Sequence, residues 1–338
     1  MKFAVNTWTF SMAFEDGRLG LEDCFKAMKT WSGNIDGIEI LANRRDTYKQ
    51  AGWVMTKSDT EEFKELVAQY NVIPVCYDSV VLGSKDGTFS HEFKRWRNPS
   101  KDDYNRQMAW LKDEIDFCAS LGFRFMRAPN LTGFYEEVFS DTFKYAEEKN
   151  VGLCMEIHAP LHITGDDIVS GWLELVDKSG GSLHGVIPDF AIFTKELPAP
   201  LIRKVLRDGV KEEAVKEICD TFKSGGDIEK TIAVSSEDAT LGPLVAQVRQ
   251  ISPIKPGDLK IVGNYIRHVH AKFYEVDENY IEHGIDFAGA LGVLKDIGYN
   301  AYVSSEYEGF LWEDKNKLDE LEQTRRVHAM MQEMLKKV

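Results

Sequence analysis

Eight short apolar segments recur along the chain, and stretches of helical length separate them. Each segment is rich in Val, Ile, Phe or Tyr and is short enough for a buried strand of a parallel sheet. The segments are 3–7, 37–41, 72–77, 123–127, 152–158, 185–190, 266–273 and 302–306. Eight alternations of strand and helix are typical of a (β/α)₈ barrel, so we predict the α/β fold class with a TIM barrel.

The same alternation is also compatible with a doubly wound open sheet. Such a sheet usually carries a glycine-rich phosphate-binding turn between an early strand and the helix that follows it. No turn of this kind follows an early strand segment in this sequence. The barrel is therefore the preferred prediction.

Amphipathic patterns predict the helices between the strands. These helices are 21–31, 58–70, 101–121, 134–150, 168–178, 287–297 and 315–336. The chain has 338 residues, whereas a barrel of this type typically needs about 250. Most of the excess lies at about 194–264, between strands six and seven, and includes a predicted helix over 201–222. We expect one domain, 1–338, with an insertion that shapes a substrate pocket or meets a partner chain.

The charge of the chain restricts its partners. With 41 Lys and Arg against 55 Asp and Glu, the formal net charge is −14, which disfavours binding to nucleic acid or to anionic lipid. No apolar run reaches the roughly 20 residues that a membrane-spanning helix needs. The first ten residues lack a signal-peptide pattern, and the five cysteines are scattered. We therefore expect a cytoplasmic protein with reduced thiols, without membrane or nucleic-acid partners.

Strand segments five to eight each carry an ionisable side chain at the point where the apolar run ends. These side chains are Glu156, Asp189, His270 and Glu306. Because active sites of this fold lie at the carboxyl ends of the strands, we expect the four to converge. Two Glu, one Asp and one His suit Mn²⁺, Mg²⁺ or Co²⁺ better than they suit a metal that prefers thiolates. Three adjacent carboxylates without a cation would repel one another, so we predict one divalent metal ion, Mn²⁺ in preference to the others.

Several of these residues have alternative interpretations. Asp189 follows a proline and could cap a helix. Either His268 or His270 could be a histidine of the core, and His270 is the expected ligand because it lies nearer the end of its strand. Glu308 could belong to a loop without a role. Four further side chains near strand ends could contact a sugar or pack in the core: Trp8, Tyr77, Arg127 and Asn130.

Four motifs carry a resemblance to a known family. They are Met155-Glu156-Ile157-His158, Pro188-Asp189-Phe190, His268-Val269-His270 and Ser304-Ser305-Glu306. With these motifs, nearly the whole chain apart from the insertion resembles the xylose-isomerase-like barrels, a superfamily of sugar isomerases and epimerases. In its ketose 3-epimerases, the corresponding Glu, Asp, His and Glu hold one divalent metal, and the two Glu exchange a proton beside a ketone. The resemblance thus implies that Glu156, Asp189, His270 and Glu306 bind the metal, with Glu156 and Glu306 as acid/base groups.

The sequence departs from those epimerases at two positions. They have a substrate-binding His three residues after the Asp and an Arg six residues after the His ligand, where this chain has Ile192 and Val276. The segments 156–160, 270–275 and 305–309 instead resemble the catalytic α subunits of bacterial C-glycoside deglycosidases. Those enzymes act on 3-oxo-glucosides of phenols and associate with a small β subunit.

The deglycosidase resemblance implies a metal-dependent carbon–carbon lyase with a glycoside substrate and a small β subunit, and we expect an oligomer. The alternatives are a sugar isomerase or ketose 3-epimerase and, less favoured, a barrel that only binds a sugar. In the lyase, His158 is the expected general base, because it shares a face with Glu156 and histidine titrates near neutral pH. It could instead be a structural histidine bonded to the backbone. Lys272 or Glu306 could help to protonate the leaving group, or Lys272 could only form ion pairs with the carboxylates.

Overall fold

Eight parallel strands form the centre of the computed structural model, which describes residues 1–33, 35–42, 55–79, 100–128, 136–235, 241–251 and 254–337. Their order in the sheet is β6-β5-β4-β3-β2-β1-β8-β7. The bounds are β1 Lys2–Asn6, β2 Ile35–Ala42, β3 Ile73–Ser79, β4 Phe125–Arg127, β5 Gly152–Ile157, β6 Gly185–Pro188, β7 Val269–Phe273 and β8 Tyr302–Tyr307. Each overlaps one predicted strand segment, so the predicted barrel is confirmed.

The barrel closes between β6 and β7. Isolated parallel bridges join Val186 to Ile266 and Asp189 to His270, and the Arg267 N–H donates to the Val186 carbonyl at 3.1 Å. Gly185 permits this approach, because a Cβ there would lie 2.1 Å from the carbonyl oxygen of Tyr265. The predicted strand 266–273 begins three residues before β7 for this reason: its first residues form bridges rather than a continuous ladder.

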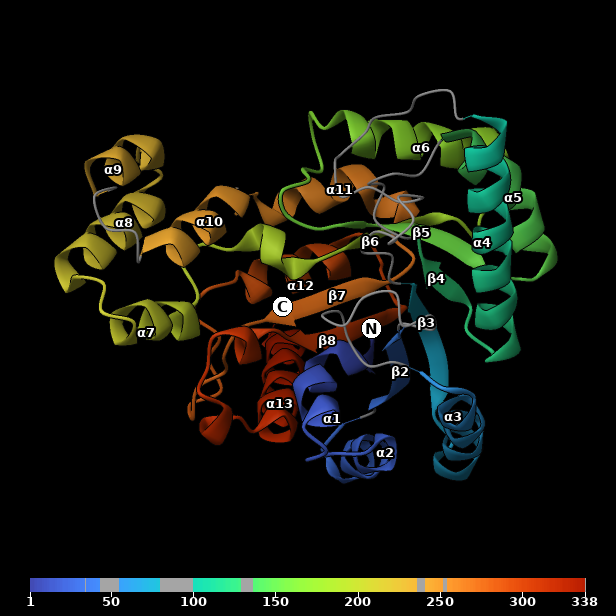
Figure 1. Ribbon diagram of the computed structural model, residues 1–338, viewed down its shortest axis with the longest axis horizontal. Coiled ribbons are helices and arrows are strands. Elements are labelled where there is room, and N and C mark those ends of the chain that lie inside the picture. Colours follow the sequence, from blue (N-terminus) through green and yellow to red (C-terminus); the bar gives the residue numbers. More distant parts are fainter. Residues whose placement is uncertain are drawn as a thin grey trace.

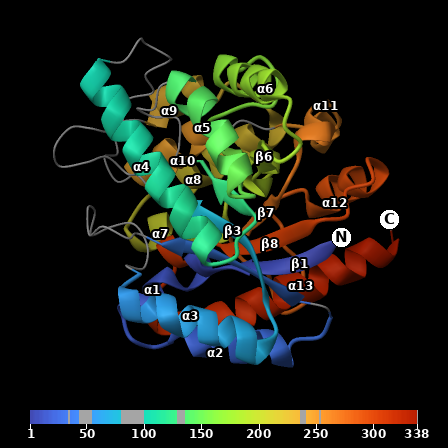
Figure 2. The ribbon, with the colours of Figure 1, turned by 90° about the vertical axis from the view of Figure 1, so that its right-hand side faces the viewer.

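Helices surround the strands, as Figures 1 and 2 show. The helices close to the barrel are α1 Ser11–Glu15, α2 Leu21–Thr30, α3 Lys57–Tyr70, α4 Lys101–Ser120, α5 Glu136–Glu148, α6 Asp167–Ser179, α12 Phe287–Asp296 and α13 Glu320–Lys337. Short 3₁₀ helices occur at Thr7–Phe10, Phe190–Phe193, Pro256–Asp258, Gly263–Tyr265, Gly309–Leu311 and Lys315–Lys317. The predicted start of the last helix at 315 is wrong, because a separate 3₁₀ turn occupies Lys315–Lys317 and α13 begins at Glu320.

In the described residues, five α-helices lie between β6 and β7. They are α7 Ala199–Arg207, α8 Glu212–Ser224, α9 Ile228–Ser235, α10 Gly242–Gln250 and α11 Leu259–Val262. The predicted single helix over 201–222 is wrong. Helix α7 ends at Arg207, Gly209 adopts a φ of +96°, and a second helix, α8, begins at Glu212. Helices α7 to α10 extend away from the strands (Figure 1). They enclose an apolar core of their own that includes Leu201, Ile218 and Leu244.

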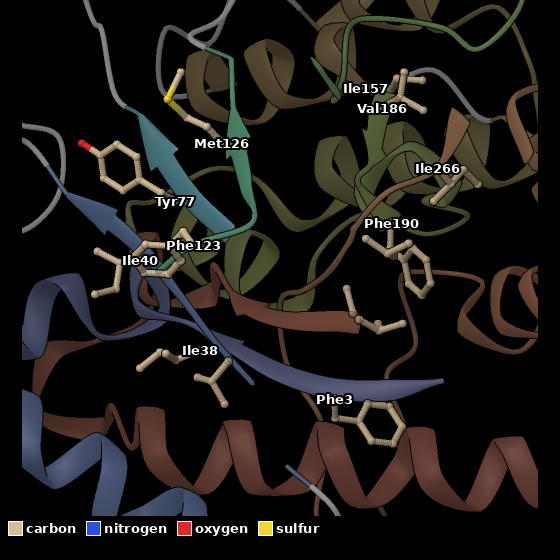
Figure 3. Packing of buried hydrophobic residues seen from close by; sticks show 14 of the residues in the cluster. Phe3, Ile38, Ile40, Tyr77, Phe123, Met126, Ile157, Val186, Phe190 and Ile266 are labelled. Carbon is tan, nitrogen blue, oxygen red and sulfur yellow. The ribbon is translucent and has the colours of Figure 1, made fainter. Parts of the chain in front are cut away.

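The two faces of the strands have different compositions. Side chains such as Phe3, Ile38 and Ile157 point outward and pack in the main apolar core, where Figure 3 shows several of them. Small residues such as Ala4 and Cys154 belong to a second buried cluster. Because side chains alternate along a strand, the residues that share a face with Ala4 and Cys154 include Asn6 and Glu156, which continue the inward face toward the carboxyl ends of the strands.

Candidate metal centre and active site

Each strand of the barrel brings a polar side chain to the interior near its carboxyl end. We call this set the interior cluster, and every member is at most 9% exposed. Its members are Asn6 from β1, Glu39 from β2, Asp78 from β3, Arg127 from β4, Glu156 from β5, Asp189 directly after β6, His268, His270 and Lys272 around β7, and Glu306 from β8. Buried charges need partners, and the contacts within this cluster show which groups have them.

The four residues expected to bind a metal lie together. One ligand atom from each of Glu156, Asp189, His270 and Glu306 can be chosen so that all four atoms lie within 4.8 Å of one another. The Nδ1 atom of His270 is 2.7 Å from Oε1 of Glu156 and 3.9 Å from Oε2 of Glu306. The structure therefore brings the predicted ligands to one point at the carboxyl ends of β5 to β8.

Hydrogen bonding distinguishes this group from the other acidic groups nearby. Glu39 could combine with Asp78 and His270, or with Cys76 and His268. However, the Glu39 oxygens lie 2.9 Å from ring nitrogens of His268 and His270. The Asp78 oxygens each accept a 3.0 Å hydrogen bond, one from Arg127 Nε and one from Asn6 Nδ2.

Two carboxylate oxygens in the group of four predicted ligands have no such partner. Asp189 Oδ2 and Glu306 Oε2 are buried and accept no hydrogen bond in the part of the chain that the structure describes. Two buried carboxylate oxygens beside an imidazole are ligands of the kind that suits a divalent cation. The donor set of Glu156, Asp189, His270 and Glu306 therefore fits a divalent metal ion.

Lys272 is the cation that lies nearest these two oxygens. Its Nζ atom is 3.1 Å from Asp189 Oδ2, 3.6 Å from Glu306 Oε2 and 3.3 Å from Glu308 Oε1. Burial alone would lower the pKa of Lys272, but the charges of Asp189, Glu308 and Glu306 outweigh it and hold this pKa well above its ordinary value. Lys272 is thus an ammonium at neutral pH, and Glu308 contacts the site rather than belonging to a loop without a role.

The two glutamates of the group have different environments. Burial raises the pKa of Glu156, but the Arg127 guanidinium, with Nη1 at 2.6 Å from Oε2, and the His270 ring outweigh it and place this pKa well below the usual range. In contrast, burial raises the pKa of Glu306 to about 8 despite the charges of Lys272 and His270. The same interior therefore favours the carboxylate form of Glu156 and the protonated form of Glu306 in the protein alone.

His158 follows directly after β5 and is partly exposed. Its Nδ1 atom is 2.5 Å from the carbonyl oxygen of Ala159. A carbonyl oxygen can only accept, so Nδ1 carries the proton and Nε2 keeps its lone pair. The bond to the backbone that one interpretation expected is present, and it leaves Nε2 available to accept a proton.

The contacts of Asp189 and of the two histidines can be compared with the alternative interpretations. Asp189 does cap a helix, because its Oδ1 accepts from the Ala191 N–H at 2.7 Å at the start of the 3₁₀ helix Phe190–Phe193. The other oxygen of the same side chain, Oδ2, lies beside Lys272 and accepts no hydrogen bond in the described residues. His270 joins that group, whereas His268 contacts Glu39 through Nε2.

Some interior residues were missed from the sequence. Asn6, Glu39 and Asp78 are polar residues within or at the end of apolar strands, the same signal that identified Glu156, and applying it to the first three strands would have found them. The tyrosine Tyr77 is fully buried and donates to Glu114 at 2.7 Å, so its role is packing. Trp8 packs edge-on against Phe310. Arg127 forms ion pairs with Asp78 and Glu156. Asn130 lies outside the described residues.

The sequence was then compared with known proteins. Residues 25–334 match the family model described as the xylose isomerase-like TIM barrel. The chain belongs to this family. In this chain, Ile192 and Val276 are buried in the apolar core. Neither residue offers a polar group to a substrate.

Two curated relatives of this family member are subunits of bacterial enzymes. A 3'-dehydrocarminate deglycosidase alpha subunit from Microbacterium is 24% identical over 60% of this chain and 62% of its own length. A C-glycoside deglycosidase alpha subunit from Arthrobacter globiformis is 27% identical over 65% of this chain and 66% of its own length. The matched segments thus span less than two thirds of these relatives.

Solved structures with the same fold include an L-ribulose 3-epimerase, with a TM-score of 0.58 at 14% identity, covering 100% of this chain and 97% of that one. A D-psicose 3-epimerase from Clostridium cellulolyticum has a TM-score of 0.56 at 14% identity and covers 99% of both chains. At these identities the likeness shows the barrel fold.

Among the residues that the structure describes, no helix is both long and apolar enough to cross a membrane.

Proposed function

We propose that this family member is a metal-dependent enzyme that removes a proton from the carbon beside a sugar ketone. The favoured reaction is that of a C-glycoside deglycosidase catalytic subunit, which cleaves the carbon–carbon glycosidic bond of a 3-oxo-glucoside by β-elimination. The observation that carries the proposal is the pair of buried oxygens that accept no hydrogen bond in the described residues, Asp189 Oδ2 and Glu306 Oε2, beside Glu156 and His270. The names of the two curated relatives support the choice of substrate class.

Glu156, Asp189, His270 and Glu306 would hold the metal, which we propose is one Mn²⁺ ion, with Mg²⁺ or Co²⁺ as substitutes. Bound there, the ion would supply Lewis-acid stabilisation of the negative charge that develops on the ketone oxygen. Lys272 and Arg127 contribute two further positive charges to the same interior, where each is paired with carboxylates.

His158 is the proposed general base. Its Nε2 lone pair takes the proton from C2 of the sugar, and the C–H electrons form the enolate with the C3 ketone. The enolate then expels the aglycone carbon from C1, so that a C1–C2 double bond forms and the C3 ketone returns. The aglycone carbon receives a proton from Lys272 or Glu306. One C–C bond breaks, one proton moves from C2 to the aglycone, and neither water nor an oxidant is consumed.

A ketose 3-epimerase is the second candidate. Its specific support is the presence of two glutamates, Glu156 and Glu306, in one ligand group, because epimerisation needs an acid/base group for each face of the carbon. The apolar burial of Ile192 and Val276 opposes it, since the resemblance to epimerases places a His and an Arg there. A barrel that only binds a sugar is less favoured still, because it would not need paired carboxylates.

One experiment separates these candidates. The purified protein, treated with EDTA and then with or without Mn²⁺, is incubated with a 3-oxo-C-glucoside and, separately, with a free ketose. The proposal expects aglycone release only after Mn²⁺ is returned. A ketose epimer instead of aglycone would favour the second candidate, and full activity after exhaustive chelation would exclude the metal.

The assembly of the protein is part of the proposal. Both curated relatives are named as alpha subunits, which supports a small β subunit as partner and an oligomer as the working form. We further propose that residues 1–338 form one domain in the cytoplasm, with the helices between β6 and β7 placed to shape the substrate site. Co-expression with a candidate β subunit, followed by the aglycone assay, tests whether the partner is needed.

A further inference from the structure

We propose that Glu39 is a positioning residue that determines which nitrogen of His270 faces the metal ligands. The inference rests on the proposed metal-dependent function. Its basis is geometric. Glu39 Oε1 lies 2.9 Å from His270 Nε2, whereas the other ring nitrogen of His270, Nδ1, lies near Glu156. Neither the sequence motifs nor the family comparison assigns a role to Glu39.

The two nitrogens of His270 face different partners. Nε2 faces Glu39, whereas Nδ1 lies 2.7 Å from Glu156 Oε1 and 3.9 Å from Glu306 Oε2. An imidazole that ligates a metal keeps its proton on the other nitrogen. Because Glu39 accepts through a carboxylate oxygen, it favours the proton on Nε2, and the Nδ1 lone pair is then directed toward Glu156 and Glu306.

Glu39 is itself held in place. It is fully buried on β2, and its second oxygen, Oε2, lies 2.9 Å from His268 Nε2. His268 and His270 are two residues apart, and their rings are 5.7 Å apart at an angle of 80°. The carboxylate therefore spans two rings of one chain segment, and rotating it would break both contacts in a buried site, which costs free energy.

The other ligands are held in a similar way, which supports the inference. Asn6 Nδ2 donates to Glu306 Oε1 at 3.3 Å, and Arg127 Nη1 donates to Glu156 Oε2 at 2.6 Å. The Ala191 N–H donates to Asp189 Oδ1. In each case, a neighbour binds one oxygen of a carboxylate and leaves the other oxygen directed toward the group. Glu39 performs the same task for the histidine.

The test measures metal binding and the ligating nitrogen directly. Zn²⁺, which is diamagnetic, is titrated into protein labelled with ¹⁵N-histidine, and the His270 signals are identified from their absence in His270→Asn. Wild-type protein is expected to show a shift of Nδ1 with Nε2 still protonated. In Glu39→Gln the side-chain volume is kept, but the charge is lost and one amide NH₂ faces a ring, so we expect metal affinity to fall about 10- to 100-fold.

Ser304→Ala is the matched control. Ser304 is buried on the inward face of β8 opposite His270 in register, and its hydroxyl accepts or donates no hydrogen bond in the described structure. The affinity of the Ser304→Ala protein for Zn²⁺ should match that of the wild type. Equal affinity and unchanged Nδ1 ligation in Glu39→Gln would overturn the inference. If Glu39→Gln does not fold, Zn²⁺ bound to Nε2 in the wild type would overturn it equally, whereas no binding in the wild type would refute the proposed function instead.

Discussion

The ammonium of Lys272 lies 3.1 Å from Asp189 Oδ2, one of the two interior carboxylate oxygens that accept no hydrogen bond. A lysine and a metal ion would thus share the same carboxylate. In the protein alone, the lysine balances part of the negative charge of the interior.

Replacing Lys272 with methionine tests this charge balance. Lys272→Met keeps the length of the side chain but removes the cation that pairs with the carboxylates of Asp189 and Glu308. Breaking a buried ion pair in this way costs about 3 kcal/mol, so the metal-free variant should unfold at a lower urea concentration. Mn²⁺ should then raise its melting temperature more than that of the wild type. Lys272→Arg is the control, and an equal response to Mn²⁺ in Lys272→Met and wild type would contradict the account.

The proposed base is tested by His158→Gln. Removing a general base typically slows a reaction by about 10²- to 10⁴-fold, and the variant should still bind Mn²⁺ because His158 is outside the group of four ligands. The comparison is His162→Gln, a partly buried histidine nearby on the same loop to which no role is assigned. Aglycone release at the wild-type rate by His158→Gln would exclude His158 as the base.

The stability of the fold should depend on pH through His328. This histidine of α13 is fully buried, its Nε2 lies 2.9 Å from Ser305 Oγ, and burial lowers its pKa to about 3. In the unfolded chain a histidine titrates near pH 6.5. The stabilisation from neutral His328 is therefore present above pH 6.5 and is lost as pH falls toward 3, by up to about 1.4 kcal/mol per pH unit.

Urea unfolding of wild type and His328→Gln at pH 7 and pH 5 measures this effect. The free energy of unfolding of the wild type should fall by about 1 to 2 kcal/mol more than that of the variant between the two values. Other groups that titrate in this range are common to both proteins and cancel in the difference. The same pH dependence in both proteins would contradict the assignment.

Much of the fold could be predicted because its signals are local. Eight buried strands alternate with amphipathic helices, and each of the last four strands has an ionisable residue near its carboxyl end that stands out among apolar neighbours. The interior partners were harder to predict. Glu39 lies between Ile38 and Ile40, and the two histidines that contact it are 229 and 231 residues away, so nothing nearby in the sequence indicates that its carboxylate has partners.

The helix break near Gly209 was missed for a related reason. The apolar spacing of 201–222 continues across the break, and only the left-handed backbone at Gly209 ends the first helix. Asp189 was difficult for the opposite reason, because its capping role and its free oxygen both occur in one side chain. Sequence patterns suggest one role per residue, whereas the two oxygens of a carboxylate can serve different partners.

The most direct test of the central claim is a calorimetric titration of Mn²⁺ into the metal-free protein. The account predicts one ion per chain in the wild type and in Glu308→Gln, which alters a carboxylate beside the group of four ligands. It predicts strongly weakened binding in Asp189→Asn, which can keep the helix cap through its carbonyl oxygen but loses the carboxylate oxygen Oδ2. Absence of binding in the wild type, or unchanged binding in Asp189→Asn, would contradict it.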